Sequence, residues 1–175
     1  MMKVEIENIV AKATLDGDLN MERISSALPG SRYQKDIMEG IIYEMNDPRS
    51  NVFLLQDGTV KVHGLTSEDQ VDQVLGSFTG MLRSAGVEIR RKGPSAIQEV
   101  ITSADIGKLD PGRIYREFSK DGIVYDPKVL PGFILRIGNT GVTVLIFPEG
   151  KIVSKGADNV MDAVSALEMV KKRLE

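Results

Sequence analysis

The chain has 175 residues and a formal net charge of −3, from 22 Lys and Arg against 25 Asp and Glu, a length that fits one domain or two small ones. It has no Cys and one His. This composition excludes a disulfide scaffold, a thiolate zinc site and a Cys nucleophile, and it argues against a multi-His metal centre. The net charge is not that of a general polyanion binder, although a locally basic face is compatible with it.

Residue patterns in the first half of the chain predict a strand, a short helix, three or four further strands and a longer helix. Alternation over Val4–Ala13 is typical of a strand, and Asn20 is a weak cap for a helix that reaches Leu28. A tight turn is expected at Asp57-Gly58, between two apolar runs. Ser67 is expected to cap the longer helix. The apolar stripe of that helix comprises Val71, Val74, Leu75, Phe78, Leu82 and Ala85.

The second half repeats the first at an offset of 92 residues. A period near 90 is too long for a solenoid unit. It predicts two copies of one small domain, residues 1–91 and 92–175, joined by a charged linker around Arg90–Pro94. The anchors of the repeat are Tyr33 with Tyr125, Gly40 with Gly132, Gly58 with Gly150, and Gly64 with Gly156.

The second copy predicts the same elements. Asp110 followed by Pro111 signals a helix that reaches Phe118. Turns are expected at Gly138–Gly141 and at Glu149-Gly150, and Val160–Leu174 has the apolar spacing of a final helix. The fold class is therefore α+β, with an antiparallel sheet covered by helices on one face.

The uncovered sheet face is the first candidate for a functional surface. The runs Val52–Leu55 and Val142–Phe147 are apolar at nearly every position, so alternation places apolar side chains on both faces. An exposed apolar patch usually marks a binding surface. The alternative is that these strands are buried on both faces, by helices or by a second copy of the chain.

The sequence resembles the TATA-binding protein family in its archaeal-type form. The resemblance covers essentially the whole chain, including its repeat. It implies a saddle made of a curved ten-stranded antiparallel sheet, with four helices on the convex face. It also implies that the concave face binds the minor groove of A·T-rich promoter DNA and kinks it with apolar side chains. The segments that carry it are Ile6–Ala11, Tyr125–Gly132, Val144–Val153 and Lys155–Ala157.

The resemblance implies four wedge positions, which the family fills with Phe. Here Phe147 alone keeps Phe, and Met38, Leu55 and Leu130 take the other three. Leu and Met are apolar and can still unstack a base step, or they can serve as ordinary packing residues. Phe53, two residues before Leu55, is expected on the same side of the sheet.

Polar contacts also depart from the family pattern. Asn8 matches a groove-contacting Asn, whereas Glu99 stands at the corresponding position of the second copy. A carboxylate cannot donate to the acceptors of an A·T pair. Glu99 therefore weakens the second half, unless a register shift turns it away. Asp126, Pro127 and Lys128 match the family's contact for transcription factor B, with Lys128 in place of a second carboxylate.

Basic residues add positive charge to the concave face. Arg136 and Lys151 match family positions, while Glu44 and Thr59 are their counterparts in the first copy. Lys61, His63 and Lys155 stand where the family usually has small apolar or Thr residues, and alternation places Lys12 on the same face. These residues either follow an electronegative groove or mark a solvated sheet. The full set of expected DNA-binding residues is Asn8, Val10, Lys12, Met38, Phe53, Leu55, Lys61, His63, Ile101, Leu130, Arg136, Leu145, Phe147, Lys151, Val153 and Lys155.

Two functions follow. The first is a transcription initiation factor that binds the minor groove of double-stranded A·T-rich promoter DNA and works with transcription factor B. The alternative is a diverged paralogue that no longer binds DNA and acts as a protein-interaction or dimerisation module, with a homodimer through the concave face. No enzyme, cofactor, metal or membrane association is expected, because the chain lacks a P-loop, a His relay and a long apolar run. Without a signal-peptide core, it is expected in the cytoplasm, on the nucleoid when bound to DNA.

Overall fold

The computed structural model describes residues 2–37 and 39–175, which form eleven strands, four α-helices and one short 3-10 helix. These residues divide into two compact units. The first unit is Asn8–Gln98, and the second unit combines Glu99–Glu175 with the residues up to Glu7. β1 (Val4–Gly17) therefore contributes to both units. The repeat boundary between residues 91 and 92 stays a prediction, because compactness and sequence repetition are different criteria.

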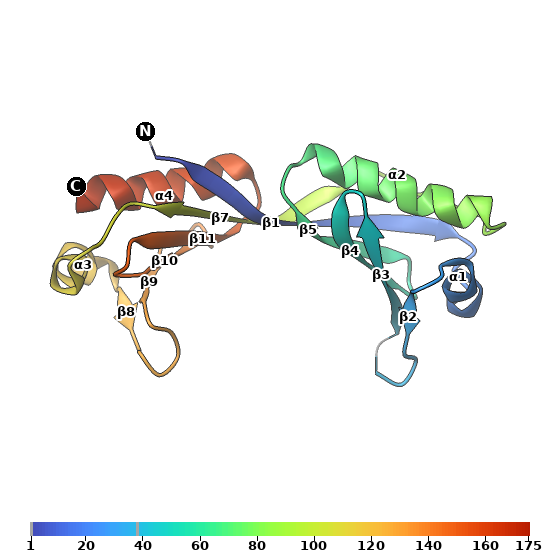
Figure 1. Cartoon of the computed structure of the whole chain (residues 1–175), viewed down its shortest axis with the longest axis horizontal. Coiled ribbons are helices and arrows are strands. Elements are labelled where there is room, and N and C mark those ends of the chain that lie inside the picture. Colours follow the sequence, from blue (N-terminus) through green and yellow to red (C-terminus); the bar gives the residue numbers. More distant parts are fainter. Residues whose placement is uncertain (1, 38) are drawn as a thin grey trace. The chain divides into compact units, whose positions relative to one another are not determined.

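The first unit is an antiparallel sheet with two helices. Its strands follow the order β2-β3-β4-β5-β1, and β6 pairs with the end of β1. The long helix α2 runs along one face of this sheet (Figure 1). The elements besides β1 are α1 (Met21–Ala27), β2 (Arg32–Tyr33), β3 (Gly40–Asn46), β4 (Arg49–Leu55), β5 (Thr59–Leu65), α2 (Asp69–Ser84) and β6 (Ile89–Arg91).

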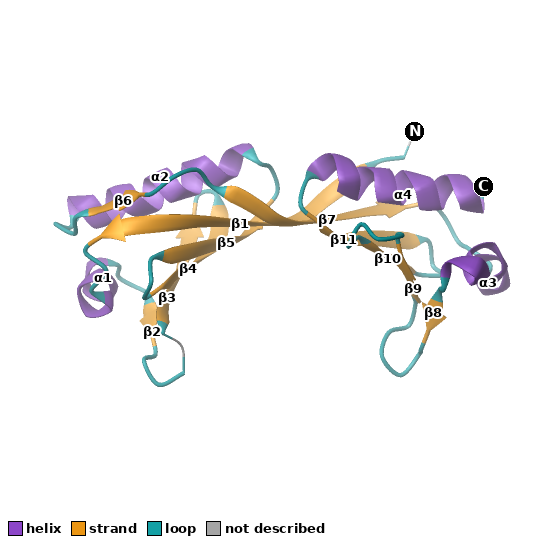
Figure 2. Cartoon of the chain, turned by 180° about the vertical axis from the view of Figure 1, so that it is seen from behind, coloured by secondary structure: helices purple, strands orange, loops and turns teal. Residues whose placement is uncertain are grey.

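The second unit repeats this arrangement. Its strands follow the order β7-β11-β10-β9-β8, and α4 covers one face of the sheet (Figure 2). The elements are β7 (Ala96–Asp105), α3 (Pro111–Phe118), the 3-10 helix Ser119–Asp121, β8 (Val124–Tyr125), β9 (Phe133–Arg136), β10 (Thr143–Ile146), β11 (Lys151–Ala157) and α4 (Val160–Leu174).

The core of each unit lies between the sheet and its long helix. Phe78 and Leu82 of α2 are fully buried, as are Leu167 and Val170 of α4. Arg173 joins α4 to α3 and to the 3-10 helix that follows it. Its guanidinium donates to the carboxylates of Glu117 and Asp121 and stacks on the Phe118 ring of α3. Helices on one face of an antiparallel sheet confirm the predicted fold class.

Two predicted caps are confirmed and one is wrong. The side chains of Asn20 and Asp110 accept hydrogen bonds from the amides three residues on, at 3.0 and 2.9 Å. Ser67 does not cap α2. The residue before that helix is Glu68, which has helical backbone angles and no side-chain cap bond. α2 therefore begins without a capping side chain, and its burial against the sheet stabilises it instead.

The predicted linker is shorter than expected. Ile89–Arg91 forms β6 and pairs with the end of β1, so that Leu15 lies opposite Arg91. Arg90 and Arg91 are also used within the first unit, in ion pairs with Asp16 at 3.1 Å and Asp72 at 2.8 Å. These charges resemble a linker in the sequence because their acidic partners lie far away along the chain.

Candidate nucleic-acid interface

Burial alternates along the strands and defines a free face on each sheet. In β1 of the first unit, Ala11 and Ala13 are buried toward α2, whereas Lys12 between them is exposed. In β4, Phe53 and Leu55 are partly exposed while Leu54 between them is buried. The strands that are apolar at nearly every position are therefore not buried on both faces by the chain itself. We call the face turned away from the long helix the open face of each unit.

Directly opposed residues form a row across the open face of the first unit. Ile42 lies opposite Phe53, Phe53 opposite Lys61, and Lys61 opposite Lys12. The His63 ring contacts Phe53 edge-on, with ring centroids 5.0 Å apart. The predicted residues Lys61 and His63 are thus next to Phe53, and the predicted Lys12 lies beyond Lys61 on the next strand.

The second unit forms the equivalent row with different chemistry. Ile134 lies opposite Leu145, Leu145 opposite Val153, and Val153 opposite Ser103. At the repeat offset, Val153 takes the place of Lys61 and Ser103 that of Lys12. The centre of the open face is therefore cationic in the first unit. In the second unit it has apolar side chains and the buried Ser103, whose hydroxyl donates to Glu7.

A bulge interrupts the same point of both sheets. In β5, His63 and Gly64 together lie opposite Val10, and in β11, Lys155 and Gly156 lie opposite Ile101. Both glycines have positive φ, 93° and 87°, which a bulge of this kind needs. Bulges re-aim the neighbouring side chains, here His63 and Lys155, both predicted from the sequence.

Asn8 and Glu99 hold these two bulges in the same way. The Gly64 amide donates to Asn8 Oδ1 at 2.7 Å, and the Gly156 amide donates to Glu99 Oε1 at 3.0 Å. The proposed register shift at Glu99 is therefore absent from the described residues, and Glu99 occupies the equivalent position to Asn8. The two side chains differ in the polar group that this bond does not use. In Asn8 it is the amide NH₂, and in Glu99 it is the second carboxylate oxygen.

The wedge positions at the ends of β4 and β10 rest on glycines. A Cβ at Gly132 would lie 2.9 Å from Cδ1 of Phe147, and one at Gly40 would lie 3.1 Å from Cδ2 of Leu55. Phe147, Leu55 and Leu130 are all partly exposed. Met38 lies outside the described residues, so its role stays a prediction.

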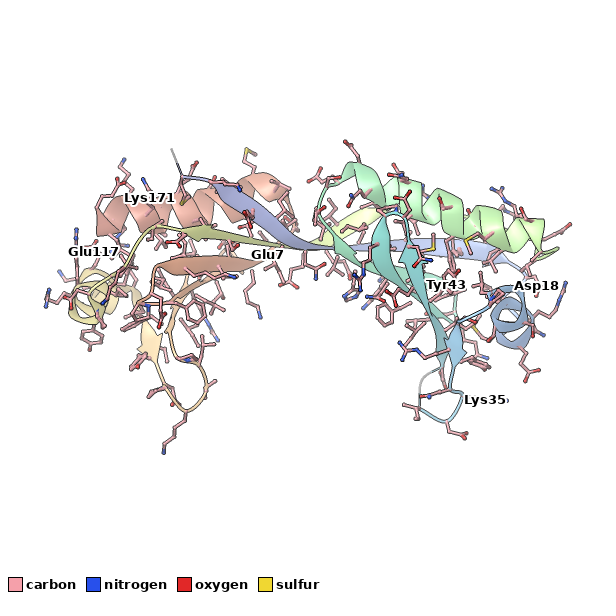
Figure 3. All side chains as sticks on the ribbon, in the orientation of Figure 1. Glu7, Asp18, Lys35, Tyr43, Glu117 and Lys171 are labelled. Carbon is pink, nitrogen blue, oxygen red and sulfur yellow. The ribbon has the colours of Figure 1, made fainter. Side chains whose placement is uncertain are left out.

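The basic residues of the second unit have an acidic neighbour that the sequence did not reveal. Arg136, Lys151 and Lys155 are exposed. Glu7 lies 3.7 Å from Lys151 Nζ and also accepts a hydrogen bond from the hydroxyl of Ser103; Figure 3 labels it. Sequence reasoning missed Glu7 because it assigned all of the first strand to the first repeat.

The loop between β8 and β9 carries the predicted partner contact. Asp126, Pro127 and Lys128 are all exposed. Asp126 also shapes the loop, because its Oδ1 accepts from the Lys128 amide at 3.0 Å and its carbonyl accepts from the Leu130 amide at 3.0 Å. Val129, at the tip, is 74% exposed. The matching loop of the first unit carries Lys35, which points into solvent (Figure 3).

One carboxyl beside the cationic row has a shifted pKa. Asp57, in the turn between β4 and β5, accepts from the Thr59 amide at 2.8 Å. Hydrogen bonds from Thr59 lower the pKa of Asp57 below its ordinary value, and the positive charge of Lys12 adds to this. The ionised carboxylate therefore holds the turn that leads into β5.

The described residues contain neither a cluster of metal-ligating side chains nor a membrane-spanning helix. Within residues 2–37 and 39–175, no three or more His, Cys, Asp or Glu side chains gather in a way that could hold a metal ion. Over the same residues, no helix has the length and apolar character needed to cross a membrane.

Comparison with known proteins identifies the family. The model of the family described as transcription factor TFIID (or TATA-binding protein, TBP) matches residues 3–85 and 95–175. TATA-box-binding protein B of Halobacterium salinarum is 31% identical over 98% of this chain and 92% of its own length. A TATA-box-binding protein of Thermococcus kodakarensis is 32% identical over 99% and 91%.

A solved structure supports the same fold. Methanococcus jannaschii TBP superposes with a TM-score of 0.85 at 23% sequence identity, covering 98% of both chains. The predicted fold family is therefore confirmed, and the matches are to transcription factors and not to enzymes. Its sequence, its repeat and its fold agree, and the chain belongs to the TATA-binding protein family of transcription factors.

Proposed function

We propose that this chain acts in transcription initiation by binding and bending A·T-rich promoter DNA, with the open face of each unit in the minor groove. The observation that carries the proposal is a pair of partly exposed apolar side chains that both units present at equivalent positions of the row, Ile42 and Phe53 in the first unit and Ile134 and Leu145 in the second. An apolar surface suits the minor groove, which offers few distinguishing donors and is read largely by shape and deformability. The expected repeats, 1–91 and 92–175, would each contact one half of the site.

Side chains at the strand ends supply the wedges. Phe147 and Leu55 occupy equivalent places, each against a glycine backbone. Leu130 lies two residues before Gly132, the glycine that Phe147 contacts. An aliphatic wedge unstacks bases with less stacking compensation than a ring. We therefore expect Phe147 and Leu130 of the second unit to kink the DNA more strongly than Leu55 and Met38 of the first unit.

Cations at the open faces supply affinity. Lys12 and Lys61 lie in the middle of the first unit's face, whereas Arg136 and Lys155 lie at the second. Phosphate contacts by such residues release counterions and make binding depend on salt. A protein with a net charge of −3 would thus bind DNA through local charge.

Transcription factor B is the proposed protein partner, at the loop of Asp126, Pro127 and Lys128. The carboxylate of Asp126 is exposed and the loop is held by its own hydrogen bonds, so it is preorganised for contact. A factor of this kind would work on the nucleoid, in the cytoplasm.

Fluorescence anisotropy with a labelled A·T-rich duplex tests the proposal at two salt concentrations, against a scrambled duplex. We expect sequence-selective, salt-dependent binding that Phe147→Ala weakens strongly. Tyr115→Ala is the matched control, because Tyr115 is an aromatic residue of α3 that is 58% exposed. Absence of duplex binding at low salt, with and without transcription factor B, would contradict the proposal. It would favour the alternative protein-interaction or dimerisation module.

A further inference from the structure

Asn8 and Glu99 are equivalent residues of opposite hydrogen-bonding character. Each accepts one hydrogen bond from the bulge glycine of its unit, at 2.7 and 3.0 Å. A backbone amide can only donate, so this bond fixes which atom of each side chain faces the backbone. Asn8 is left with two N–H donors, and Glu99 is left with a second carboxylate oxygen that can only accept. Neither leftover group bonds to protein among the residues that the structure describes.

The minor-groove edges of A·T and G·C pairs differ in a way that matches the unused groups of Asn8 and Glu99. The floor of the groove at an A·T pair presents acceptors alone, whereas a G·C pair adds the donor N2–H₂ of guanine. An amide NH₂ therefore suits A·T, and a free carboxylate oxygen suits guanine. The charged residues near Asn8 and near Glu99 also differ, and the difference favours the same two kinds of base pair.

The surroundings of Asn8 favour a narrow, electronegative groove. Lys12 lies on the same strand, four residues after Asn8 and on the other side of the bulge, and is opposed by Lys61. Alternation places it on the same face as Asn8. A·T tracts have such a groove, which attracts inserted cations. The equivalent row of the second unit has Ser103 and Val153 in these places and lacks this preference.

The surroundings of Glu99 reduce the repulsion between its carboxylate and DNA phosphates. Lys155 is exposed in the same bulge as Gly156, the residue that Glu99 bonds. Its ammonium can contact the phosphate backbone while Glu99 reaches the base edge.

We propose that the two units read different halves of one element: the first unit an A·T half, and the second unit a half in which a guanine amino group donates to Glu99. The inference rests on the proposed function, because it requires that both open faces contact the minor groove. It makes Glu99 a specificity-determining residue and gives the element a direction.

A scan of one G·C pair through an A·T-rich duplex tests the inference by anisotropy. We expect the wild-type chain to prefer G·C over A·T at one position in one half of the element. Glu99→Gln keeps a carbonyl oxygen for the Gly156 amide and gains a donor. It should reverse the preference at that position by about tenfold, the usual scale for one base pair.

Two further variants make the test specific. Glu168→Gln removes the same charge from an exposed position of α4 and should leave the base preference unchanged. Asn8→Asp keeps the acceptor for the Gly64 amide but loses the donors, and should make a G·C pair acceptable in the other half.

The outcomes separate the inference from the function it rests on. Duplex binding in which Glu99→Gln and wild type rank every scanned position alike would overturn the inference alone. Failure of wild type and all variants to bind any duplex would overturn the proposed function and the inference with it. Thermal unfolding of each variant shows whether a loss of binding comes from a loss of folding.

Discussion

The ring of Phe147 lies directly against the backbone of Gly132, so closely that a Cβ at position 132 would come within 2.9 Å of the ring atom Cδ1. Leu55 and Gly40 have the same relationship in the first unit. In each unit, a residue at the end of one strand thus packs where a side chain is missing at the start of the neighbouring strand. Leu55 ends β4 and Gly40 begins β3, whereas Phe147 directly follows β10 and Gly132 directly precedes β9. This pairing ties each wedge position to the fold of its unit.

Gly132→Ala and Gly40→Ala should therefore have different effects. At Gly132 a Cβ would meet the Phe147 ring at 2.9 Å, which can turn, and the Ile146 carbonyl oxygen at 3.0 Å. We therefore expect a stability loss of about 1 kcal/mol and weaker DNA binding. At Gly40 the nearest atom is the Leu54 carbonyl oxygen, at 2.6 Å, which is fixed in the sheet. We expect a loss of about 3 kcal/mol there. Urea unfolding and duplex anisotropy measure both, and equal stability of the two variants would contradict this account.

Lys61→Val places in the first unit the residue that the second unit has at Val153. Lys61 is directly opposed by Lys12, and like charges in opposed positions of a sheet repel. We expect the variant to be more stable by about 0.5 kcal/mol. We also expect its affinity for DNA to depend less on salt, with a slope lower by about one for a lost phosphate contact. Lys172→Val on α4 is the control for net charge, and an equal change in its salt slope would contradict a local role for Lys61.

Lys128→Glu should strengthen the contact with transcription factor B. The substitution places a second carboxylate beside the exposed Asp126, as the resemblance to the family implies for the proposed contact. We expect affinity for the factor, measured on the protein–DNA complex, to rise by roughly tenfold, or about 1.4 kcal/mol. Lys120→Glu, an exposed residue of the 3-10 helix, is the charge-matched control. The loop has no such role if both variants bind the factor equally.

Asp57→Asn should reduce the sensitivity of the fold to acid. Because the pKa of Asp57 is lowered in the folded chain, its contribution to stability is present above its ordinary value of 3.8 and is lost as the pH falls through the lowered pKa. Urea midpoints at pH 6 and pH 3 measure this. We expect a smaller difference between the two midpoints for Asp57→Asn than for wild type. An identical difference would show that the Thr59 hydrogen bonds do not stabilise the turn.

Local signals in the sequence were sufficient for the four α-helices and for most of the strands, whereas β6 resembles a linker in the sequence. Asn20 and Asp110 cap helices as predicted, since a cap depends on residues within three positions of each other. The apolar spacing of α4 and the paired glycines at an offset of 92 were equally readable. Ser67 failed as a cap because burial of α2 against the sheet, and not a capping bond, stabilises that helix.

Contacts between residues far apart in the chain could not be predicted from the sequence, and only the tertiary structure determines them. Alternation places Lys12 and Lys61 on one face, but only the strand register sets them opposite each other. Nothing in the sequence around Glu7 indicates that it contacts Ser103 and Lys151, because the strand order of the second unit brings them together. In the same way, Glu99 looked like a lost contact in the sequence. Its bond to the Gly156 amide shows that it is the equivalent of Asn8, which bonds the Gly64 amide. The sequence alone does not reveal this, because each amide is more than fifty residues away from its side chain.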